Sequence, residues 1–431
     1  MSKKFSVPRG TNDILPEDSP QWQMIELKSR EILKNYNYKE IRTPIFEETE
    51  LFARSMGQTS DIVQKQMLNL ASQRKDENEN IQLSGLSLRP ENTASVVRSY
   101  VQNSMDRKES LTKLFYFGPM FRGERPQKGR LRQFHQVGVE AIGPNSASPY
   151  LDAEVISLSV EMLKSFGLNT FKLKINTLGS PEDKNAFSGM LRDKLCVHLG
   201  KLCDDCKLRF ERNVFRILDC KDKECKDIVK SIDLDHSYLS KESSEYYSEV
   251  KKTLDTLGIE YEESLDLVRG LDYYTHIVFE ISDSSLGSQD ALGAGGRYND
   301  LVSQLGGAEV DAVGFALGIE RIILARQKVE VDKLSSLSTY VIALDYASMQ
   351  KAFTMLNVIR NNCISSDMSF GVSSLKSQMR AANKAGAQFV LIFGEDEVSK
   401  NTVTIKDMRE GSQRSINDDE VVQYLTGILK R

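Results

Sequence analysis

The stretch that decides the fold runs from 114 to 143 and reads LFYFGPMFRGERPQKGRLRQFHQVGVEAIG. Two of its segments, 114–122 and 133–143, are rich in aromatic and aliphatic residues, and a loop of ten residues joins them. Runs of this kind with one connecting loop predict two strands that pair as a hairpin. Because a segment with helical periodicity, 20–40, precedes these strands, we expect an antiparallel sheet in an α+β domain.

Side chains of the second strand alternate between two faces, since successive residues of a strand point in opposite directions. The apolar face carries Val137, Val139 and Ala141, and the opposite face carries Phe134, Gln136, Gly138 and Glu140. We expect the apolar face to be buried. Gly138 would leave a recess between an amide and a carboxylate, where a small ligand approaches the sheet. A half-solvated sheet face is the alternative interpretation.

The loop between the two strands is strongly basic. Against a single acid, Glu124, the segment 122–132 contains five basic residues, which are Arg122, Arg125, Lys128, Arg130 and Arg132. Arginine side chains match phosphate oxygens in a bidentate geometry. The sequence therefore predicts that the loop binds the phosphates of a nucleotide, the backbone of a nucleic acid, or both. A solvated surface hairpin is the alternative interpretation.

Further patterns follow along the chain. Residues 181–262 are mostly charged and helical, and we interpret them as an inserted helical module. Strand signals return at 271–282, and GFALGIERIILA at 314–325 predicts a strand that turns into a helix. Arg321 lies in the first turn of that helix, where the helix dipole favours acids, so a functional role is indicated. After a polar linker, strand–helix alternation predicts a small α/β domain.

Composition and motifs exclude several classes of protein. The 431 residues are 40% hydrophobic and 27% charged, as in ordinary globular proteins. Apolar runs stay below the roughly 20 residues of a membrane span, and the basic N-terminus lacks the apolar segment of a secretory signal. We therefore expect a cytoplasmic protein without a membrane partner. The net charge of -4 argues against a chain whose whole surface coats nucleic acid. A Walker P-loop, an HExxH motif and a GxSxG elbow are missing from the sequence.

Four of the six cysteines are spaced as C-x2-C followed by C-x4-C, and they are Cys203, Cys206, Cys220 and Cys225. This spacing is compatible with a zinc site. The second pair is loosely spaced and lies in a charged helical region, so reduced thiols without a metal are the alternative. Disulfides are not expected in a cytosolic protein.

Several motifs together resemble one family. FRGERPQKGRLRQFHQVGVE at 121–140 looks like motif 2 of the class II aminoacyl-tRNA synthetases, and GFALGIERI at 314–322 looks like motif 3. The resemblance narrows to the histidyl-tRNA synthetases through LRPENT at 88–93, VRGLDYYTHIVFE at 268–280, AGGRY at 294–298, PRGTNDILP at 8–16 and TSDIVQKQM at 59–67. It covers nearly the whole chain.

The resemblance implies a histidine–tRNA ligase that works as a homodimer. Histidine and ATP, with Mg²⁺, would form histidyl-adenylate and pyrophosphate, and the histidyl group would then pass to the 3′ end of tRNA-His. It also implies a catalytic domain over 1–325 with the helical insertion at about 181–262, a linker at 326–338 and an anticodon-binding domain over 339–431.

The resemblance assigns three sets of site residues. The set for histidine is Glu91, Thr93, Arg122, Gln136, Glu140, Arg269, Tyr273, Tyr274 and Tyr298. The set for ATP is Arg122, Glu124, Arg130 and Arg321, and the expected catalytic cations are Arg122, Arg269 and Arg321. The set for tRNA is Arg125, Gln127 and Lys128 in the basic loop, and Lys376, Arg380 and Lys384 on one face of a predicted helix. A solvated helix face is the alternative for the last three.

Finer expectations concern single positions. Glu140 and Tyr274 would bind the two imidazole nitrogens. An extended backbone would place Tyr273 on the face opposite Tyr274, so Tyr273 either lines the pocket or fills the core. Gly270 would leave space for the histidine carboxylate. Asn92 stands where the family has the glycine of RPEGT, and asparagine tolerates a positive φ there.

The competing interpretation is not an enzyme. A paralogue of the synthetase fold serves as the regulatory subunit of ATP phosphoribosyltransferase, and it typically lacks the anticodon domain and several catalytic arginines. This chain has Arg122, Arg269 and Arg321 together with a C-terminal α/β unit. These features favour the ligase.

Overall fold

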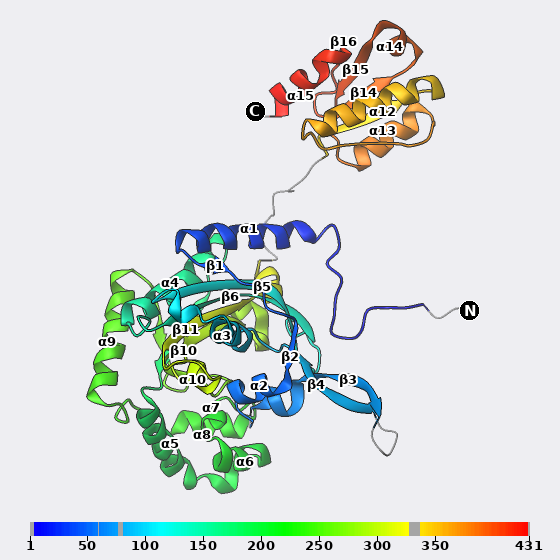
Figure 1. Ribbon diagram of the computed structural model, residues 1–431. Coiled ribbons are helices and arrows are strands. Elements are labelled where there is room, and N and C mark those ends of the chain that lie inside the picture. Colours follow the sequence, from blue (N-terminus) through cyan, green and yellow to red (C-terminus); the bar gives the residue numbers. More distant parts are fainter. Residues whose placement is uncertain (1–3, 59, 76–80, 327–336, 430–431) are drawn as a thin grey trace. The chain divides into compact units, whose positions relative to one another are not determined.

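The computed structural model describes residues 4–58, 60–75, 81–326 and 337–429 (Figure 1). Its contacts divide the chain into two compact units, Met1–Glu330 and Val331–Arg431. Most of the proposed linker, 327–336, lies outside the described residues, as does Thr59 of the TSDIVQKQM motif.

An eight-stranded sheet forms the centre of the first unit, with the order β1-β5-β6-β11-β10-β9-β7-β8. The strands are β1 (Lys39–Glu40), β5 (Thr112–Phe121), β6 (Gln133–Gly143), β7 (Lys172–Thr177), β8 (Glu262–Glu263), β9 (Thr275–Ser282), β10 (Ala291–Arg297) and β11 (Asp311–Gly318). Only the short strands at the two ends, β1 and β8, pair in parallel. The predicted antiparallel pair is confirmed, since β5 and β6 run antiparallel with Gly118 opposite Gln136.

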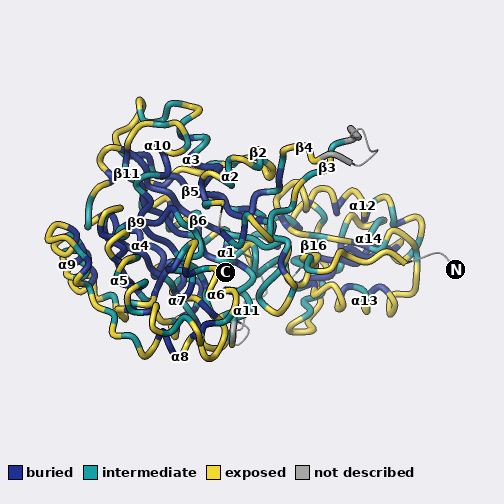
Figure 2. Tube along the Cα trace, turned by 90° about the horizontal axis from the view of Figure 1, so that it is seen from below, coloured by how far each residue is buried: buried dark blue, intermediate teal, exposed yellow. Residues whose placement is uncertain are grey.

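Helices cover one face of this sheet. They are α1 (Ser19–Asn35), α4 (Pro149–Ser165), α9 (Lys241–Thr256) and α11 (Ile319–Ala325). Val137, Val139 and Ala141 of β6 are fully buried against them, as the alternation predicts. Figure 2 shows the buried residues concentrated in the strands of this unit. Because α9 contributes Tyr247, Val250 and Leu254 to the same core, this helix of the segment 181–262 belongs to the body of the sheet.

The other face of the sheet carries polar side chains such as Gln136 and Glu140, and further helices enclose it. These are α2 (Thr49–Met56), η1 (Ile62–Gln66), α3 (Thr93–Gln102), α5 (Pro181–Cys196), α6 (Asp204–Arg212), α7 (Phe215–Leu218), α8 (Lys223–Ser231) and α10 (Leu301–Gln304). A separate three-stranded sheet has the order β2-β4-β3 and contains β2 (Phe46–Glu48), β3 (Leu68–Lys75) and β4 (Ile81–Leu88). It brings the RPENT segment, which follows β4, to the edge of the large sheet, where the Phe121 N–H donates to the Arg89 carbonyl at 2.9 Å.

The second unit is a five-stranded mixed sheet with the order β13-β12-β14-β15-β16. Its strands are β12 (Thr339–Ala343), β13 (Ser366–Met368), β14 (Phe389–Phe393), β15 (Thr402–Asp407) and β16 (Gln413–Asn417), and its helices are α12 (Tyr346–Asn361), α13 (Leu375–Lys384), α14 (Glu395–Lys400) and α15 (Val421–Leu429). β12 is parallel to both of its neighbours, so the predicted α/β architecture is confirmed. One hydrophobic cluster packs α12 and α15 on one face, and a second packs α13 on the other.

Candidate active site

A cavity of about 310 Å³ opens on the polar face of the large sheet, beside β6, β10 and β11. This volume is in the range of small-molecule sites. All twelve residues predicted for histidine, ATP and catalysis line it, namely Glu91, Thr93, Arg122, Glu124, Arg130, Gln136, Glu140, Arg269, Tyr273, Tyr274, Tyr298 and Arg321. They come from segments up to 230 positions apart (321 − 91 = 230), and the sheet brings them together.

Glu140 is the carboxylate at the bottom of the cavity and is only 1% exposed. Its carboxylate accepts hydrogen bonds from the Thr93 hydroxyl at 2.7 Å and from the Tyr298 hydroxyl. Burial raises the pKa of Glu140 to about 8, although both hydrogen bonds act in the opposite direction. A Cβ at Gly314 would lie 2.1 Å from a carboxylate oxygen of Glu140, so glycine is required on the facing strand.

The prediction that Gly138 leaves a recess for a ligand is wrong. A Cβ at Gly138 would lie 2.4 Å from both Cζ and Oη of Tyr116, so the ring of Tyr116 fills this space instead of a ligand. Gln136 and Glu140 still share the cavity face, as the strand alternation predicts. The buried Oε1 of Gln136 has no hydrogen-bond partner among the described residues, so this cavity-lining residue has an unsatisfied acceptor.

The RPENT segment holds Glu91 through its own backbone. The carboxylate of Glu91 accepts the N–H of Thr93 at 2.7 Å and that of Ala94 at 3.0 Å, at the start of α3. Burial nevertheless raises the pKa of Glu91. Asn92 has a φ of −118°, so the expected positive φ is wrong. Its Oδ1 instead accepts hydrogen bonds from Thr43 at 2.7 Å and from Arg89 at 3.1 Å.

Four arginines bring positive charge into the same cavity, and backbone carbonyls hold two of them. The Nε of Arg122 donates to the Pro90 carbonyl at 2.9 Å, and its guanidinium lies 5.1 Å from the ring centre of Phe134. The guanidinium of Arg321 donates to the carbonyls of Gly129 at 2.8 Å and Ala291 at 2.7 Å. Burial lowers the pKa of Arg122 to about 10, and the neighbouring cations Arg130 and Arg269 add to the decrease.

Arg269 differs from Arg122 and Arg321 because it forms an ion pair with an acidic side chain. Its Nη1 pairs with Glu280 of β9, and its buried Nε has no partner among the described residues. Burial and the positive neighbours also lower the pKa of Arg321, so the cavity holds cations that repel one another. A site with fixed, mutually repelling cations favours an anionic ligand that relieves the repulsion.

Tyr273 lies in a turn and Tyr274 directly follows it, so neither residue is part of β9. Their rings are therefore on the same side, with ring centres 4.6 Å apart, and both line the cavity. The expectation that they point to opposite faces is wrong, because strand alternation does not apply in a turn. The ring of Tyr273 also meets that of Tyr298 edge-on, with ring centres 5.6 Å apart.

The basic loop has an inner and an outer part. Glu124 and Arg130 form an ion pair in the cavity lining, and the Gln127 and Arg130 backbones exchange hydrogen bonds at 3.0 and 2.9 Å. The tip is exposed and carries the predicted tRNA-binding residues, which are Arg125, Gln127 and Lys128. Two groups of predicted residues lie outside the cavity: the exposed α13 residues Lys376, Arg380 and Lys384, and the four clustered cysteines.

The structure adds lining residues that sequence patterns do not reveal. Lys221 reaches the cavity from the helical segment, and Glu320 from α11. The Glu320 carboxylate accepts the backbone N–H of His135 at 2.9 Å and lies 2.9 Å from its Nδ1, so it fixes the start of β6. Gly270 lines the cavity, but a Cβ there would lie 3.1 Å from the guanidinium of Arg216, which limits the space predicted for a ligand.

Comparison with known proteins identifies the family. The family model for histidyl-tRNA synthetase matches residues 10–322, and the model for an anticodon-binding domain matches 338–428. The histidine–tRNA ligase of Halothermothrix orenii is 44% identical over 412 residues, which cover 95% of this chain and 96% of its own. That of Bacillus velezensis is 41% identical and covers 99% of this chain and 100% of its own.

Solved structures support the same family. The apo histidyl-tRNA synthetase of S. aureus has a TM-score of 0.78 and 36% identity, covering 98% of this chain and all of its own. A chain described as an ATP phosphoribosyltransferase regulatory subunit/histidyl-tRNA synthetase from Bacillus halodurans has a TM-score of 0.64 at 24% identity, which shows the fold alone. Among the described residues, no helix is both long and apolar enough to cross a membrane. The chain belongs to the histidyl-tRNA synthetase family, with a class II catalytic domain followed by an anticodon-binding domain.

Proposed function

We propose that this protein is a histidine–tRNA ligase that activates histidine with ATP and then transfers it to the 3′ end of tRNA-His. One observation carries the chemistry: four arginines share a cavity with buried carboxylates and four phenols. Both reactants of amino-acid activation are anions, so fixed cations are needed to offset their repulsion and hold the approach geometry. The family membership supports the choice of histidine and tRNA.

In the activation step, an oxygen of the histidine carboxylate attacks the α-phosphorus of ATP. The new C–O–P bond forms as the bond from the α-phosphorus to the bridging oxygen breaks, and pyrophosphate leaves with that electron pair. Arg122 is proposed to hold the α-phosphate and Arg321 the γ-phosphate. Arg269 holds the histidine carboxylate against the α-phosphate. Mg²⁺ is proposed to enter with ATP as part of the substrate.

The nucleotide end of the cavity is proposed to include the ion pair of Glu124 and Arg130. This pair already joins the two sides of the basic loop, so an incoming phosphate would compete with Glu124 for the Arg130 guanidinium. The hairpin bonds between Gln127 and Arg130 keep the loop folded over the site during that exchange.

The histidine end is built around Glu140. A carboxyl group with a pKa near 8 accepts a hydrogen bond from an imidazole N–H when ionised and donates one to a ring nitrogen when protonated. Tyr274 is proposed to bind the second ring nitrogen, with Tyr273 and Tyr298 forming the walls. Glu91, Thr93 and Gln136 are proposed to surround the α-amino group. Glu91 is the buried acid of that set and Gln136 its unpaired acceptor.

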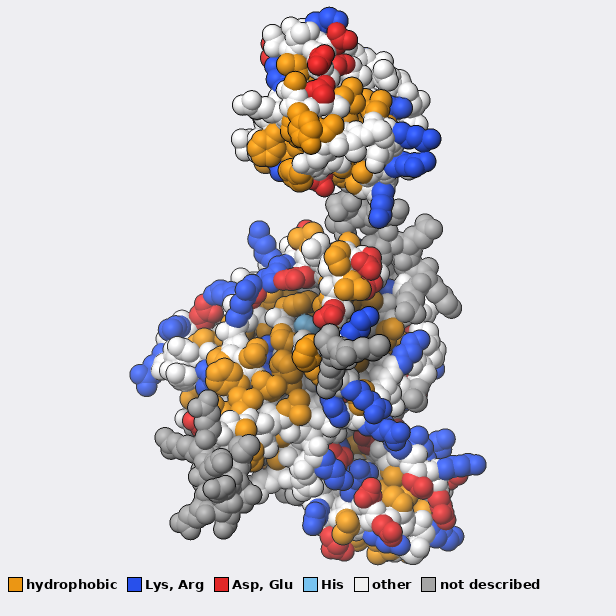
Figure 3. All heavy atoms as spheres, turned by 90° about the vertical axis from the view of Figure 1, so that its right-hand side faces the viewer, with side chains coloured by type: hydrophobic (Ala, Val, Ile, Leu, Met, Phe, Trp, Pro, Cys, Tyr) orange, Lys and Arg blue, Asp and Glu red, His pale blue; other side chains and the backbone are white. Residues whose placement is uncertain are grey.

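For tRNA we propose two basic surfaces. Arg125, Gln127 and Lys128 at the loop tip are next to the active site and would contact the acceptor end. The α13 residues Lys376, Arg380 and Lys384 are exposed at i, i+4 and i+8 and would contact phosphates near the anticodon. Figure 3 shows Lys and Arg side chains gathered along one edge of the C-terminal unit.

The working protein is proposed to be a homodimer in the cytoplasm. Large hydrophobic side chains that a dimer interface would cover are exposed in the first unit, including Ile45 at 44%, Phe46 at 48% and Leu83 at 66%. Exposed hydrophobic side chains also gather on the face of that unit in Figure 3. Light scattering on the eluting peak of a sizing column tests the dimer.

The decisive experiment is ATP–pyrophosphate exchange with histidine, with each of the other amino acids as a control. Exchange that depends on histidine alone is expected, followed by charging of tRNA-His and not of other tRNAs. Absence of exchange with histidine contradicts the proposal. Pyrophosphate exchange without charging of tRNA-His would support the proposed activation of histidine and contradict the proposed transfer to tRNA-His.

A further inference from the structure

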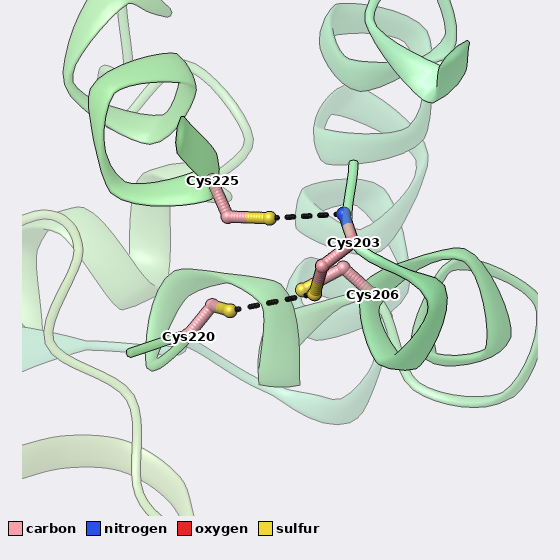
Figure 4. A group of neighbouring side chains, drawn as sticks. All are labelled: Cys203, Cys206, Cys220 and Cys225. Carbon is pink, nitrogen blue, oxygen red and sulfur yellow. Dashed lines mark hydrogen bonds between the residues drawn. The ribbon is translucent and has the colours of Figure 1, made fainter. Parts of the chain in front are cut away.

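The four cysteines of the helical segment converge on one point (Figure 4). Cys203 caps the start of α6 and Cys206 lies in its first turn. Cys220 follows the end of α7, and Cys225 is in the first turn of α8. Three short helices, of nine, four and nine residues, therefore meet at their cysteines.

The positions of the sulfur atoms fit a tetrahedral metal. All four Sγ atoms lie within 4.8 Å of one another, and Cys203 and Cys220 are 3.9 Å apart. Four thiolates at the usual Zn–S distance of about 2.3 Å lie about 3.8 Å from one another. The described geometry therefore needs a contraction of less than about 1 Å to hold a zinc ion.

The surroundings of the sulfur atoms also suit ligands. Cys206 and Cys225 are fully buried and Cys220 is 6% exposed, whereas Cys203 is half-buried, so three of the four sulfur ligands are shielded from water. The backbone N–H of Cys203 donates to Cys225 Sγ at 3.3 Å, the kind of bond that orients a thiolate ligand. Asp222 accepts the N–H of Cys225 at 3.1 Å and fixes the start of α8.

We propose that Cys203, Cys206, Cys220 and Cys225 bind one structural zinc ion. Four protein ligands leave no open coordination position, which is the arrangement of a structural and not a catalytic site. A shell of four sulfur ligands favours zinc over the harder divalent cations. Because the ligands come from three short helices and meet at one ion, metal binding would add to the folding energy of this segment.

The proposed zinc also fixes residues that border the active site. Between the two cysteine pairs, Asn213 donates to Asp272 of the VRGLDYY segment at 2.9 Å, and Arg216 pairs with Asp61 at 2.9 Å. Lys221, next to a proposed ligand, lines the cavity. Loss of zinc would therefore loosen the wall that carries Arg269, in addition to the helices themselves.

The test is metal analysis of the full-length protein after free histidine, which binds zinc, has been removed by gel filtration. We expect about one zinc per chain, and less than a tenth of that in Cys206→Ser and Cys225→Ser. Cys196→Ser and Cys363→Ser are the matched controls, since both thiols are exposed and outside the cluster, and they should keep the wild-type content. Stoichiometric iron, a disulfide found by mass spectrometry, or four titratable thiols with no metal would each overturn the proposal.

A second measurement uses the wild-type protein, so it remains informative if the cysteine variants do not fold. In the wild-type protein, stepwise addition of a mercurial reagent should release zinc in proportion to the cluster thiols that react, and zinc should reach a plateau with the fourth of them. The cobalt-substituted protein should show the intense absorption of tetrahedral cobalt thiolate. Zinc release unrelated to thiol modification, or an octahedral cobalt spectrum, contradicts the four-cysteine site.

Discussion

The cavity and helix α13 are both basic, but they hold their cations in opposite ways. In the cavity, Arg122 and Arg321 donate to backbone carbonyls, and burial lowers the pKa of each. On α13, Lys376 and Lys384 are exposed on one helical face. Fixed, desolvated cations act on charge that develops at one point, whereas exposed cations act on an extended polyanion and are screened by salt. Substitutions should therefore have large, local effects in the cavity and small, salt-dependent effects on α13.

The largest effect is expected for Arg269→Ala. Removing the cation proposed to hold the histidine carboxylate should reduce pyrophosphate exchange by about 10³-fold, the range for loss of a buried charge-stabilising donor. Arg107→Ala, which changes an exposed arginine outside the cavity lining, is the control and should cost much less. Near wild-type exchange by a folded Arg269→Ala protein would remove its catalytic role.

Glu140→Gln comes next. The amide cannot take a proton or carry a negative charge, so kcat/KM for histidine should fall by about 10²-fold, the cost of a buried charged hydrogen bond. The KM for ATP should change little. If histidine and ATP are affected equally, Glu140 supports the whole cavity and does not recognise the imidazole.

The same substitution tests the protonation of Glu140. The folded pKa of about 8 is above the unfolded value, so the folded protein binds a proton more tightly. Its contribution to stability is complete below the unfolded pKa and is lost as the pH rises through about 8, with a limiting slope of about 1.4 kcal/mol per pH unit. Urea unfolding at a series of pH values should show this loss in the wild type and not in Glu140→Gln. Parallel pH profiles would contradict the raised pKa.

A smaller effect separates the paired phenols. Tyr274→Phe removes a proposed bond to the imidazole and should raise the KM for histidine by about 10-fold. Tyr273→Phe leaves the ring that packs between the other two phenols and should change the KM by less than about 3-fold. The KM for histidine is measured for both variants by varying the histidine concentration in the exchange assay. The reverse order would assign the imidazole contact to Tyr273.

The smallest effect is expected on α13. Lys376→Ala with Lys384→Ala should weaken tRNA binding several-fold and reduce the slope of log K against log salt by about 2, one unit for each lost phosphate contact. Pyrophosphate exchange should be unchanged. Met349→Ala on α12 provides a control that removes no charge. An unchanged salt slope would show that this helix face does not contact tRNA.

Sequence rules predicted the positions of side chains correctly where the local backbone followed the rule. Alternation in β6 placed Gln136 and Glu140 on one face, and the motifs identified the arginines. The rule failed at Tyr273 and Tyr274, because Tyr273 lies in a turn and Tyr274 follows it before the strand begins. The predicted recess at Gly138 also failed, because the ring of Tyr116 on the adjacent strand fills the space. Alternation within one strand does not predict which side chains of neighbouring strands cover it.

By itself, the sequence determined the antiparallel pair at 114–143, the α/β unit at the C-terminus and the family, because alternation, periodicity and motif residues are local properties of the chain. Tertiary structure alone decided that Lys221 and Glu320 reach the cavity and that four loosely spaced cysteines converge on one point. It also decided the raised pKa of Glu140, since burial removes the water that would solvate the charge. Spacing and motifs only suggested which residues would meet, because the distances between distant segments and the desolvation of a side chain are products of packing.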